Sequence, residues 1–239
     1  MKAIILAAGI GSRLRPQTDE IPKCLVKVNE QDSIIDTQIK ALKTANIEEI
    51  IIITGYRANQ IQEYILNKYT ELKFTFIENN KYLTTNNMYS FLLAKPYLES
   101  QSFVSLNADV ALDDQIIKGL LNNPNSNLIA VDKEMFSEES MKVKIGKPTE
   151  AVISISKGIE ERDAFAVSID VYKIAKEASN IIFAVAQSVI DSEGENQWFE
   201  VALNESFQQI DFATHEIQGL KWFEIDNQED LLKAKELFK

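Results

Sequence analysis

Short apolar runs alternate with stretches of helical periodicity along the first half of the chain. Runs typical of buried parallel strands occupy residues 3–6, 49–54 and 103–107, and residues 72–77 alternate like a further strand. Between them, helical spacing of apolar residues predicts helices over 33–45 and 57–69, and a third helix is expected to begin at residues 86–87. This succession predicts a parallel sheet with right-handed crossovers and helices packed on its faces.

The second half of the chain adds antiparallel features. Residues 141–145 and 151–156 alternate on either side of a Gly-Lys-Pro turn region and predict a hairpin. Further strands are expected at 128–131, 165–170 and 222–226, and helices at 114–121, 172–189 and 227–238. We therefore expect an α/β fold, Rossmann-like, with a mostly parallel central sheet, helices on both faces and an antiparallel hairpin addition. Because no linker, repeat or low-complexity tract interrupts it, residues 1–239 are expected to form a single domain.

Composition narrows the possible functions. A hydrophobic fraction of 45% is ordinary for a globular protein, and no apolar run approaches the roughly 20 residues of a membrane span. The chain shows no signal-peptide pattern, and its single cysteine, Cys24, excludes an intrachain disulfide, so we expect a cytoplasmic protein without a membrane partner. A net charge of −11 argues against nucleic-acid binding, but a locally positive site for a nucleotide remains compatible with it.

Candidate chemistry is concentrated where the first strand ends. Side chains become small there, which lets backbone N–H groups approach a phosphate. The residues concerned are Leu6, Ala7, Ala8, Gly9, Gly11 and Ser12. Arg13 adds a fork of donors and Lys23 a compact positive charge, so the stretch predicts a polyphosphate site.

Two other phosphate-binding motifs and an ordinary tight turn compete with this interpretation. A dinucleotide fingerprint needs a third glycine where the chain has Leu14, which disfavours a Rossmann oxidoreductase. A Walker-type loop is absent. For an isolated G-x-G an ordinary strand-to-loop turn is the more common explanation.

The full sequence of this turn and the residues after it distinguishes among these alternatives. It reads Leu6-Ala7-Ala8-Gly9-Ile10-Gly11-Ser12-Arg13-Leu14-Arg15-Pro16-Gln17-Thr18, followed by Pro22-Lys23. It resembles the signature of the sugar-phosphate nucleotidyltransferases, which runs roughly L-A-A-G-x-G-[ST]-R-[LM]-x-P-x-T…P-K. The resemblance implies that Arg13 and Lys23 act on the phosphates of a nucleoside triphosphate as catalytic residues.

Two aspartates after predicted strands are candidate metal ligands. Asp109 follows the strand at 103–107, in the ligand crevice of a parallel sheet, where a carboxylate suits Mg²⁺. The resemblance places metal ligands at both Asp109 and Asp226, so Mg²⁺ is the expected cofactor. Each could instead cap a helix; we assign the cap near residue 114 to Asp113 and favour the metal for Asp226.

Thr85, Asn86 and Asn87 belong to a T-N-N-x-x-S pattern, although one asparagine alone would serve as a helix cap. The pattern resembles the choline-phosphate cytidylyltransferase branch, in which it lies near the nucleotide base and the acceptor. The resemblance implies a Mg²⁺-dependent CTP:phosphomonoester cytidylyltransferase that forms a CDP-linked product and pyrophosphate. Residues 1–115 would bind the nucleotide and residues 116–239 a small phosphorylated acceptor. Phosphocholine and phosphoglutamine are the expected acceptors, for bacterial surface-polysaccharide (capsule) modification.

The acceptor side is the least determined part of the chain. Candidate contacts are Lys142, Lys144, Arg162, Trp198 and Glu200. The two lysines share a strand face that could equally be a solvated edge. Val201 stands where the family's W-[YF]-E-D pattern has a second acid, so the acceptor pocket departs from the family.

Other functions remain open at this stage. They are a uridylyl- or other nucleotidyltransferase acting on a sugar 1-phosphate, and a nucleotide-binding regulatory module without turnover. A homodimer is likewise open as the assembly state.

Overall fold

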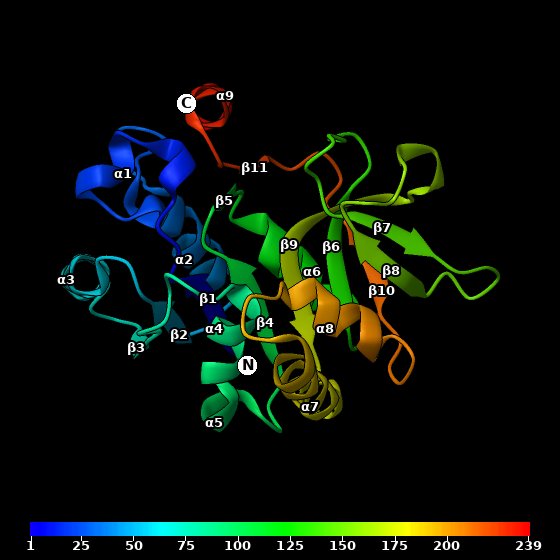
Figure 1. Cartoon of the computed structure of the whole chain (residues 1–239). Helices are drawn as coiled ribbons and strands as arrows, with labels where there is room; N and C mark the ends of the chain where they lie inside the picture. The colour runs from blue at the N-terminus through cyan, green and yellow to red at the C-terminus, as the bar shows by residue number, and fades with distance from the viewer.

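The computed structural model describes residues 1–239 and contains a nine-stranded sheet and a separate two-stranded sheet (Figure 1). The strands are β1 Lys2–Ala7, β2 Glu49–Thr54, β3 Lys73–Glu78, β4 Phe103–Asn107, β5 Val110–Leu112, β6 Leu128–Asp132, β7 Lys142–Ile145, β8 Val152–Ser156, β9 Ala166–Ile174, β10 Ala213–Glu216 and β11 Trp222–Glu224. The α-helices are α1 Gln17–Glu20, α2 Ile34–Thr44, α3 Ala58–Lys68, α4 Asn87–Leu93, α5 Lys95–Leu98, α6 Gln115–Asn122, α7 Lys176–Glu193, α8 Phe199–Ser206 and α9 Gln228–Leu237.

The large sheet has the order β10-β6-β9-β4-β1-β2-β3. Strands β4, β1, β2 and β3 are parallel neighbours, whereas β9 is antiparallel to β4, β6 and β7. The β7–β8 hairpin joins the large sheet through β7, which pairs with β9. The predicted fold class is therefore confirmed.

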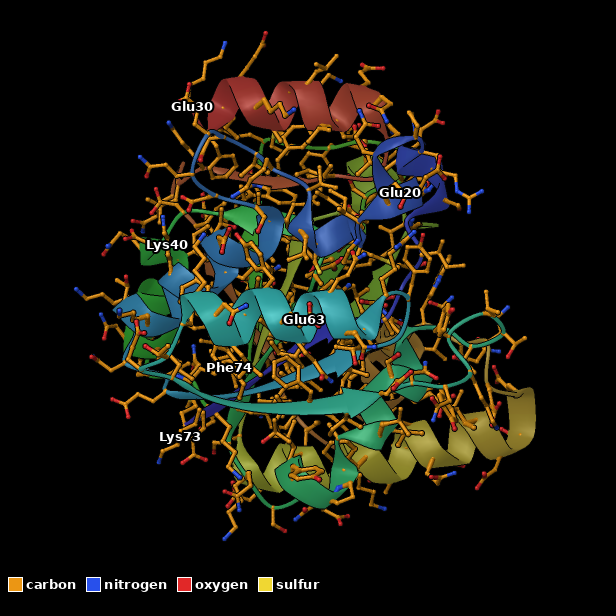
Figure 2. All side chains as sticks on the ribbon, turned by 90° about the vertical axis from the view of Figure 1, so that its left-hand side faces the viewer. Glu20, Glu30, Lys40, Glu63, Lys73 and Phe74 are labelled. Atoms are coloured by element: carbon orange, nitrogen blue, oxygen red, sulfur yellow. The ribbon has the colours of Figure 1, made fainter.

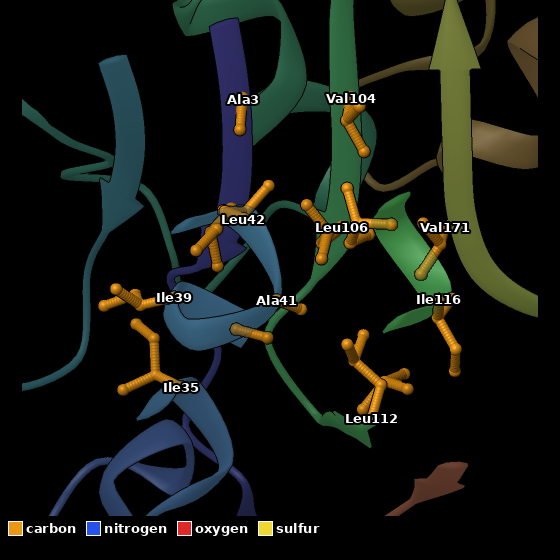
Figure 3. Close-up of a cluster of buried hydrophobic side chains, with 14 of the residues drawn as sticks. Ala3, Ile35, Ile39, Ala41, Leu42, Val104, Leu106, Leu112, Ile116 and Val171 are labelled. Atoms are coloured by element: carbon orange, nitrogen blue, oxygen red, sulfur yellow. The ribbon is translucent and has the colours of Figure 1, made fainter. Parts of the chain in front are cut away.

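Helices cover both faces of the large sheet because its central strands are apolar on both sides. Alternate residues of β1 illustrate this: Ala3 and Ile5 pack with α2, α3 and α6, while Ile4 and Leu6 pack with α4, α5, α7 and α8. Figure 3 shows Leu42 of α2 near Ala3 on the first of these faces, with Ile39 and Ile35 farther along the same helix. No helix is long and apolar enough to cross a membrane.

The outer surface of the helices is polar. Figure 2 views the molecule from the side of α3 and β3, with Glu63 on the helix that lies over the sheet. Glu63 is exposed, whereas Ile61 and Ile65 of the same helix are buried. This amphipathic period is what made α3 predictable from the sequence.

A third apolar cluster packs the C-terminal helix α9 against the loop that follows β1. Leu14 and Val26 pack there with Ile225 before α9 and Leu231 within it. The small β5–β11 sheet lies beside this cluster, and its antiparallel register pairs Glu224 with Val110. The end of the chain is thereby held next to the turn that follows β1.

Some predicted boundaries were wrong or incomplete. The helix expected over 172–189 begins only at Lys176, because β9 continues through the apolar residues Val171 and Tyr172 to Ile174. Strands β5 and β10 and helix α8 were not predicted as separate elements. Each is short, and β5 and β10 owe their pairing to distant partners.

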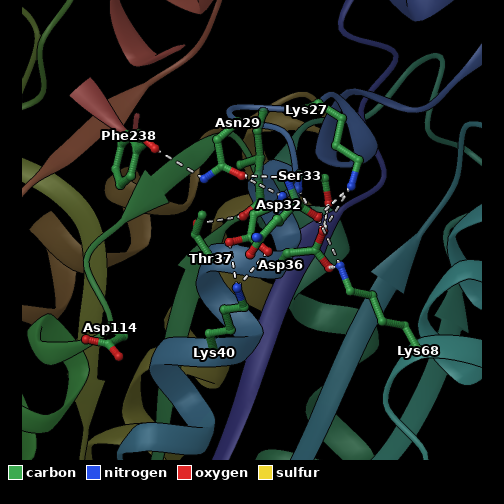
Figure 4. Close-up of polar contacts among 12 residues, drawn as sticks. Lys27, Asn29, Asp32, Ser33, Asp36, Thr37, Lys40, Lys68, Asp114 and Phe238 are labelled. Carbon is green, nitrogen blue, oxygen red and sulfur yellow. Dashed lines mark hydrogen bonds and ion pairs between the residues drawn. The ribbon is translucent and has the colours of Figure 1, made fainter. Parts of the chain in front are cut away.

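A buried carboxylate network fixes the start of α2 (Figure 4). Asp36 is fully buried and accepts hydrogen bonds from the Ser33 amide at 2.7 Å and from the Tyr64 and Tyr69 hydroxyls at 2.6 and 2.7 Å. Lys68 of α3 approaches it at 2.9 Å. Burial alone would raise the pKa of Asp36, but these donors outweigh burial and lower the pKa to about 2.

The substitution Asp36→Asn is expected to lower the free energy of unfolding by about 2 kcal/mol or more, because an amide cannot accept all these hydrogen bonds. Since the folded-state pKa lies below the ordinary value of 3.8, this stabilisation is present above pH 3.8 and is lost as the pH falls through about 2. Urea unfolding across this pH range should show the stability difference between wild type and variant shrinking with acid. Asp163→Asn, at an exposed site, is the control; a pH-independent difference would contradict the assignment.

Candidate functional site

The turn after β1 brings glycine backbone and a lysine side chain into contact. Gly11 has a φ of +68°, in the left-handed region, and a Cβ there would lie 2.9 Å from the Cβ of Lys23. Glycine is therefore required at this position by both conformation and space. Leu6, Ala7 and Ala8 are buried at the end of the strand, Gly9 is exposed, and Ser12 begins a 3₁₀ turn that carries Arg13.

Lys23 lies between two carboxylates that are distant in sequence. Its Nζ is 3.0 Å from Oδ2 of Asp109 and 2.8 Å from Oδ1 of Asp226. Burial lowers the pKa of Lys23, but Asp109 and Asp226 outweigh burial and the net shift is upward. Arg13 binds the other oxygen of Asp226 at 2.8 Å, with its own side chain 60% exposed. Two predicted cations and two predicted metal ligands thus meet at one place.

Asp109, Glu224 and Asp226 form a possible metal-binding group. One carboxylate oxygen from each lies within 4.8 Å of the others. The β5–β11 pairing and the bond from the Ile225 amide to the Asp109 carbonyl, at 3.0 Å, bring them together. Oδ1 of Asp109 is buried without a hydrogen-bond partner, and three hard oxygen donors suit Mg²⁺, so these residues fit the expected metal.

The structure also shows whether Asp109 and Asp226 cap helices. Asn227, not Asp226, caps α9, in a capping box with Asp230. Near α6 it is Asp113 whose side chain accepts a hydrogen bond, from the Gln115 amide at 2.9 Å. Asp109 and Asp226 are therefore not used as helix caps.

A cavity of about 220 Å³ extends from this ion-pair cluster toward α4 and α8. Asn86 and Asn87 line it together with Trp198, and the Asn87 side chain accepts a hydrogen bond from the Phe199 amide at 2.8 Å. Asn86 also caps α4. Thr85 lies in the preceding turn, where it bonds with Asn79 and the Lys81 carbonyl.

The far wall of the cavity is acidic. Glu200, in the first turn of α8, and Asp170, within β9, are both buried and both bonded to the Tyr172 hydroxyl, at 3.0 and 3.1 Å. Burial, together with the nearby charge of Glu200, raises the pKa of Asp170 to about 8. Burial also raises the pKa of Glu224.

Three predicted acceptor contacts do not line the cavity. The Lys142 ammonium is buried and donates to the backbone carbonyls of Glu138, Ser140 and Lys157. Lys144 is exposed on β7, and Arg162 is 79% exposed and paired with Glu160. Trp198 and Glu200 do line the cavity, and their role as acceptor contacts stays a prediction.

Six residues that line this cavity were not predicted as site residues, and the ionisable ones nearest the predicted ligands include Lys157, Asp170 and Glu224. Lys157 lies beside Trp198, 5.4 Å from the ring centroid, and pairs with Glu139 at 3.1 Å. Glu224 could have been predicted, because it is two residues from Asp226 and alternate side chains of an extended segment point to the same side. No local signal marks Lys157 or Asp170.

The fold and this geometry are typical of one class of protein, the α/β enzymes that bind a nucleoside polyphosphate at the carboxyl end of parallel strands. Residues 2–129 match the nucleotidyl transferase family. The choline-phosphate cytidylyltransferase of Streptococcus pneumoniae is 32% identical over 241 residues, covering 100% of this chain and 99% of that protein. The chain belongs to the nucleotidyl transferase family and is a nucleotidyltransferase.

Other relatives match in part or in structure. The CTP:phosphoglutamine cytidylyltransferase of Campylobacter jejuni is 41% identical over 138 residues, 56% of this chain and 53% of that protein. The solved CTP:phosphocholine cytidylyltransferase from Streptococcus pneumoniae superposes with a TM-score of 0.78 at 28% identity, covering 100% and 99% of the two chains. A glucose-1-phosphate thymidylyltransferase structure from Bacillus anthracis, described as putative, has a TM-score of 0.84 at 20% identity over 99% and 94%, a likeness of fold.

Lys23 occupies the place between two carboxylates that a divalent cation would share. We expect Lys23→Ala to strengthen Mn²⁺ binding in the absence of nucleotide by about tenfold or more, because one like charge at ion-pair distance is removed. Isothermal titration calorimetry of wild type and variant measures this. Lys118→Ala, at an exposed site on α6, is the matched control. Equal or weaker Mn²⁺ binding by Lys23→Ala would argue against a shared site.

Proposed function

We propose that the protein is a Mg²⁺-dependent cytidylyltransferase that joins the CMP part of CTP to a small acceptor bearing a phosphate or phosphonate and a positively charged nitrogen. The observation that supports it most is the meeting of Arg13, Lys23, Asp109 and Asp226 at the glycine turn. The cytidylyltransferase relatives support the choice of CTP. Use of the product in surface-polysaccharide modification stays a prediction.

The reaction needs alignment and charge neutralisation more than proton transfer. A phosphomonoester has a second pKa near 6, so its attacking oxygen is already deprotonated at neutral pH. It attacks the α-phosphorus of CTP in line, a new P–O bond forms, and the bond to pyrophosphate breaks. The sole histidine, His215, is hydrogen-bonded to Asn123 away from the cavity, which suits a reaction without a histidine base.

Each cation near the glycine turn then has a separate role. Arg13, exposed at the mouth, would hold the leaving phosphates, and backbone N–H groups from Gly9 to Ser12 would bind the triphosphate. Lys23 would neutralise the oxygens of the α-phosphate. Asp109, Asp226 and Glu224 would hold Mg²⁺, which when bound offsets the negative charge on the phosphate oxygens.

The acidic residues at the acceptor end of the cavity favour a substrate with a positively charged head group. Its wall carries Asp170 and Glu200, which suit a cation, while Lys157 would exchange its exposed partner Glu139 for the acceptor phosphate. Phosphocholine and phosphoglutamine both fit this description. The relatives include a 2-aminoethylphosphonate cytidylyltransferase of Lancefieldella rimae, 37% identical over 48% of this chain and 45% of that protein.

Pyrophosphate release is expected with CTP and not with UTP, ATP, GTP or dTTP when Mg²⁺ and an amine-bearing phosphate are present. Each nucleotide should be tested against phosphocholine, phosphoglutamine, 2-aminoethylphosphonate and glucose 1-phosphate. Comparable pyrophosphate release from UTP would contradict the proposal that the enzyme prefers cytosine as the base. A preference for glucose 1-phosphate would instead make the protein a sugar-phosphate enzyme.

Lys23→Ala and Asp109→Ala are each expected to lower kcat by about 100-fold or more, the scale of losing one electrostatic stabiliser of the transition state. Lys118→Ala should retain full activity, and circular dichroism should confirm that all variants are folded. Near-normal turnover in Lys23→Ala would remove its proposed catalytic role.

A further inference from the structure

Asp170 and Glu200 are buried acids without a basic partner. Their residues are 8% and 3% exposed, and no lysine or arginine lies within ion-pair distance of either carboxylate. Asp170 receives hydrogen bonds from Asn107 and Tyr172, and Glu200 receives one from the same Tyr172 hydroxyl. One hydroxyl proton cannot serve both acids at once. The pair therefore has acceptor capacity that the protein itself does not fill.

The backbone is distorted where Asp170 enters the cavity. Asp170 has a φ of +57° within β9, and the β6–β9 register shifts across this point, with Ile129 opposite Tyr172 and Val131 opposite Ser168. Such bulges redirect a side chain out of the regular pleat. A buried carboxylate and a positive φ each cost stability, and the hydrogen bonds from Asn107 and Tyr172 leave the charge of Asp170 without a cation.

Both acids line the 220 Å³ cavity that adjoins the proposed metal and phosphate groups. The other cations of the site are already engaged: Arg13 and Lys23 pair with Asp226, and Lys157 pairs with Glu139. A ligand that reaches Asp170 and Glu200 must therefore bring its own positive charge. Its phosphate would remain at the opposite, cationic end.

The composition of the lining distinguishes between kinds of ammonium. Among the residues that line the cavity, Trp198 is the only aromatic one, and the Lys157 ammonium already lies over its ring. The Tyr172 ring is 1% exposed and packs edge-on against Phe199. A trimethylammonium group has no N–H donor and is recognised by several aromatic faces, whereas a primary ammonium donates up to three hydrogen bonds.

Resting on the proposed function, we infer that Asp170 and Glu200 bind the head group of the acceptor and select a primary ammonium over a quaternary one. Asp170 and Glu200 accept its N–H bonds, and Tyr172 turns its hydroxyl to whichever carboxylate oxygen remains. Phosphocholine is then a poor substrate although the chain resembles enzymes that use it.

The test is a methylation series at constant chain length: phosphoethanolamine, its N-methyl and N,N-dimethyl derivatives, and phosphocholine, each with CTP and Mg²⁺. For the wild type, kcat/KM should fall along the series by about 100-fold in total, the scale of losing charge-assisted hydrogen bonds. Binding in the presence of a non-hydrolysable CTP analogue, measured by calorimetry, should follow the same order.

Asp170→Asn and Glu200→Gln keep the side-chain shapes, and asparagine tolerates a positive φ. Each should raise the KM for phosphoethanolamine, leave the KM for CTP unchanged, and bring phosphocholine to within about tenfold of phosphoethanolamine, because one charged acceptor is lost. Glu205→Gln, exposed on the same helix as Glu200, is the matched control. Thermal melts confirm folding.

Several outcomes would overturn the inference. They are equal kcat/KM along the series, a preference for phosphocholine, or variants that slow all four acceptors equally. A weakened Mn²⁺ activation constant in Asp170→Asn would assign the pair to a metal instead. If CTP supports release with any acceptor but without this ranking, only the head-group inference fails. If no acceptor supports release from CTP, the proposed function fails first and this inference with it.

Discussion

The bridge that Lys23 makes between Asp109 and Asp226 is the interaction on which the site depends. Its two bonds span 86 and 203 positions of sequence, so they join the opening loop, the middle of the chain and its end. Gly11 packs directly on the Lys23 side chain, and the β5–β11 pair holds the two aspartates in place. A change in any one of these elements would move charges that must lie within ion-pair distance of one another.

The site has more acidic than basic residues, and a bound divalent metal and a cationic substrate group would offset this imbalance. Around the cavity, the three cations Arg13, Lys23 and Lys157 face six acids, namely Asp109, Glu139, Asp170, Glu200, Glu224 and Asp226. Burial raises the pKa of Asp170, because the charged form lacks both water and a cation. A divalent metal and a cationic head group would each supply what the unliganded site lacks, and the triphosphate would then meet Arg13 and Lys23.

The sequence predicted the fold, which is confirmed, and a nucleotide site at the glycine turn, which stays a prediction, because both depend on local signals. Apolar runs such as residues 49–54 predict a buried strand wherever they stand, and the turn from Leu6 to Arg13 is a contiguous string. The acceptor half depends on tertiary placement instead. The alternation of residues on β7 did not show that the Lys142 ammonium is buried against three carbonyls. No residue next to Asp170 in sequence predicts the bulge that directs its side chain into the cavity.

The difference between the two halves has a physical origin. Triphosphate binding uses backbone N–H groups and cations, which a short turn after one strand can supply by itself. Recognition of a head group needs side chains on several walls of a cavity, which in the proposed acceptor site would come from β9, from α8 and from Trp198 just before α8. The distorted β9 is tolerated because it lies in a nine-stranded sheet with helices packed on both faces, so surrounding contacts hold Asp170 in a conformation it would not adopt alone. β9 thus combines a positive φ with a buried acid on the wall proposed for the acceptor, while the parallel strands β1, β2, β3 and β4 pair in unbroken register.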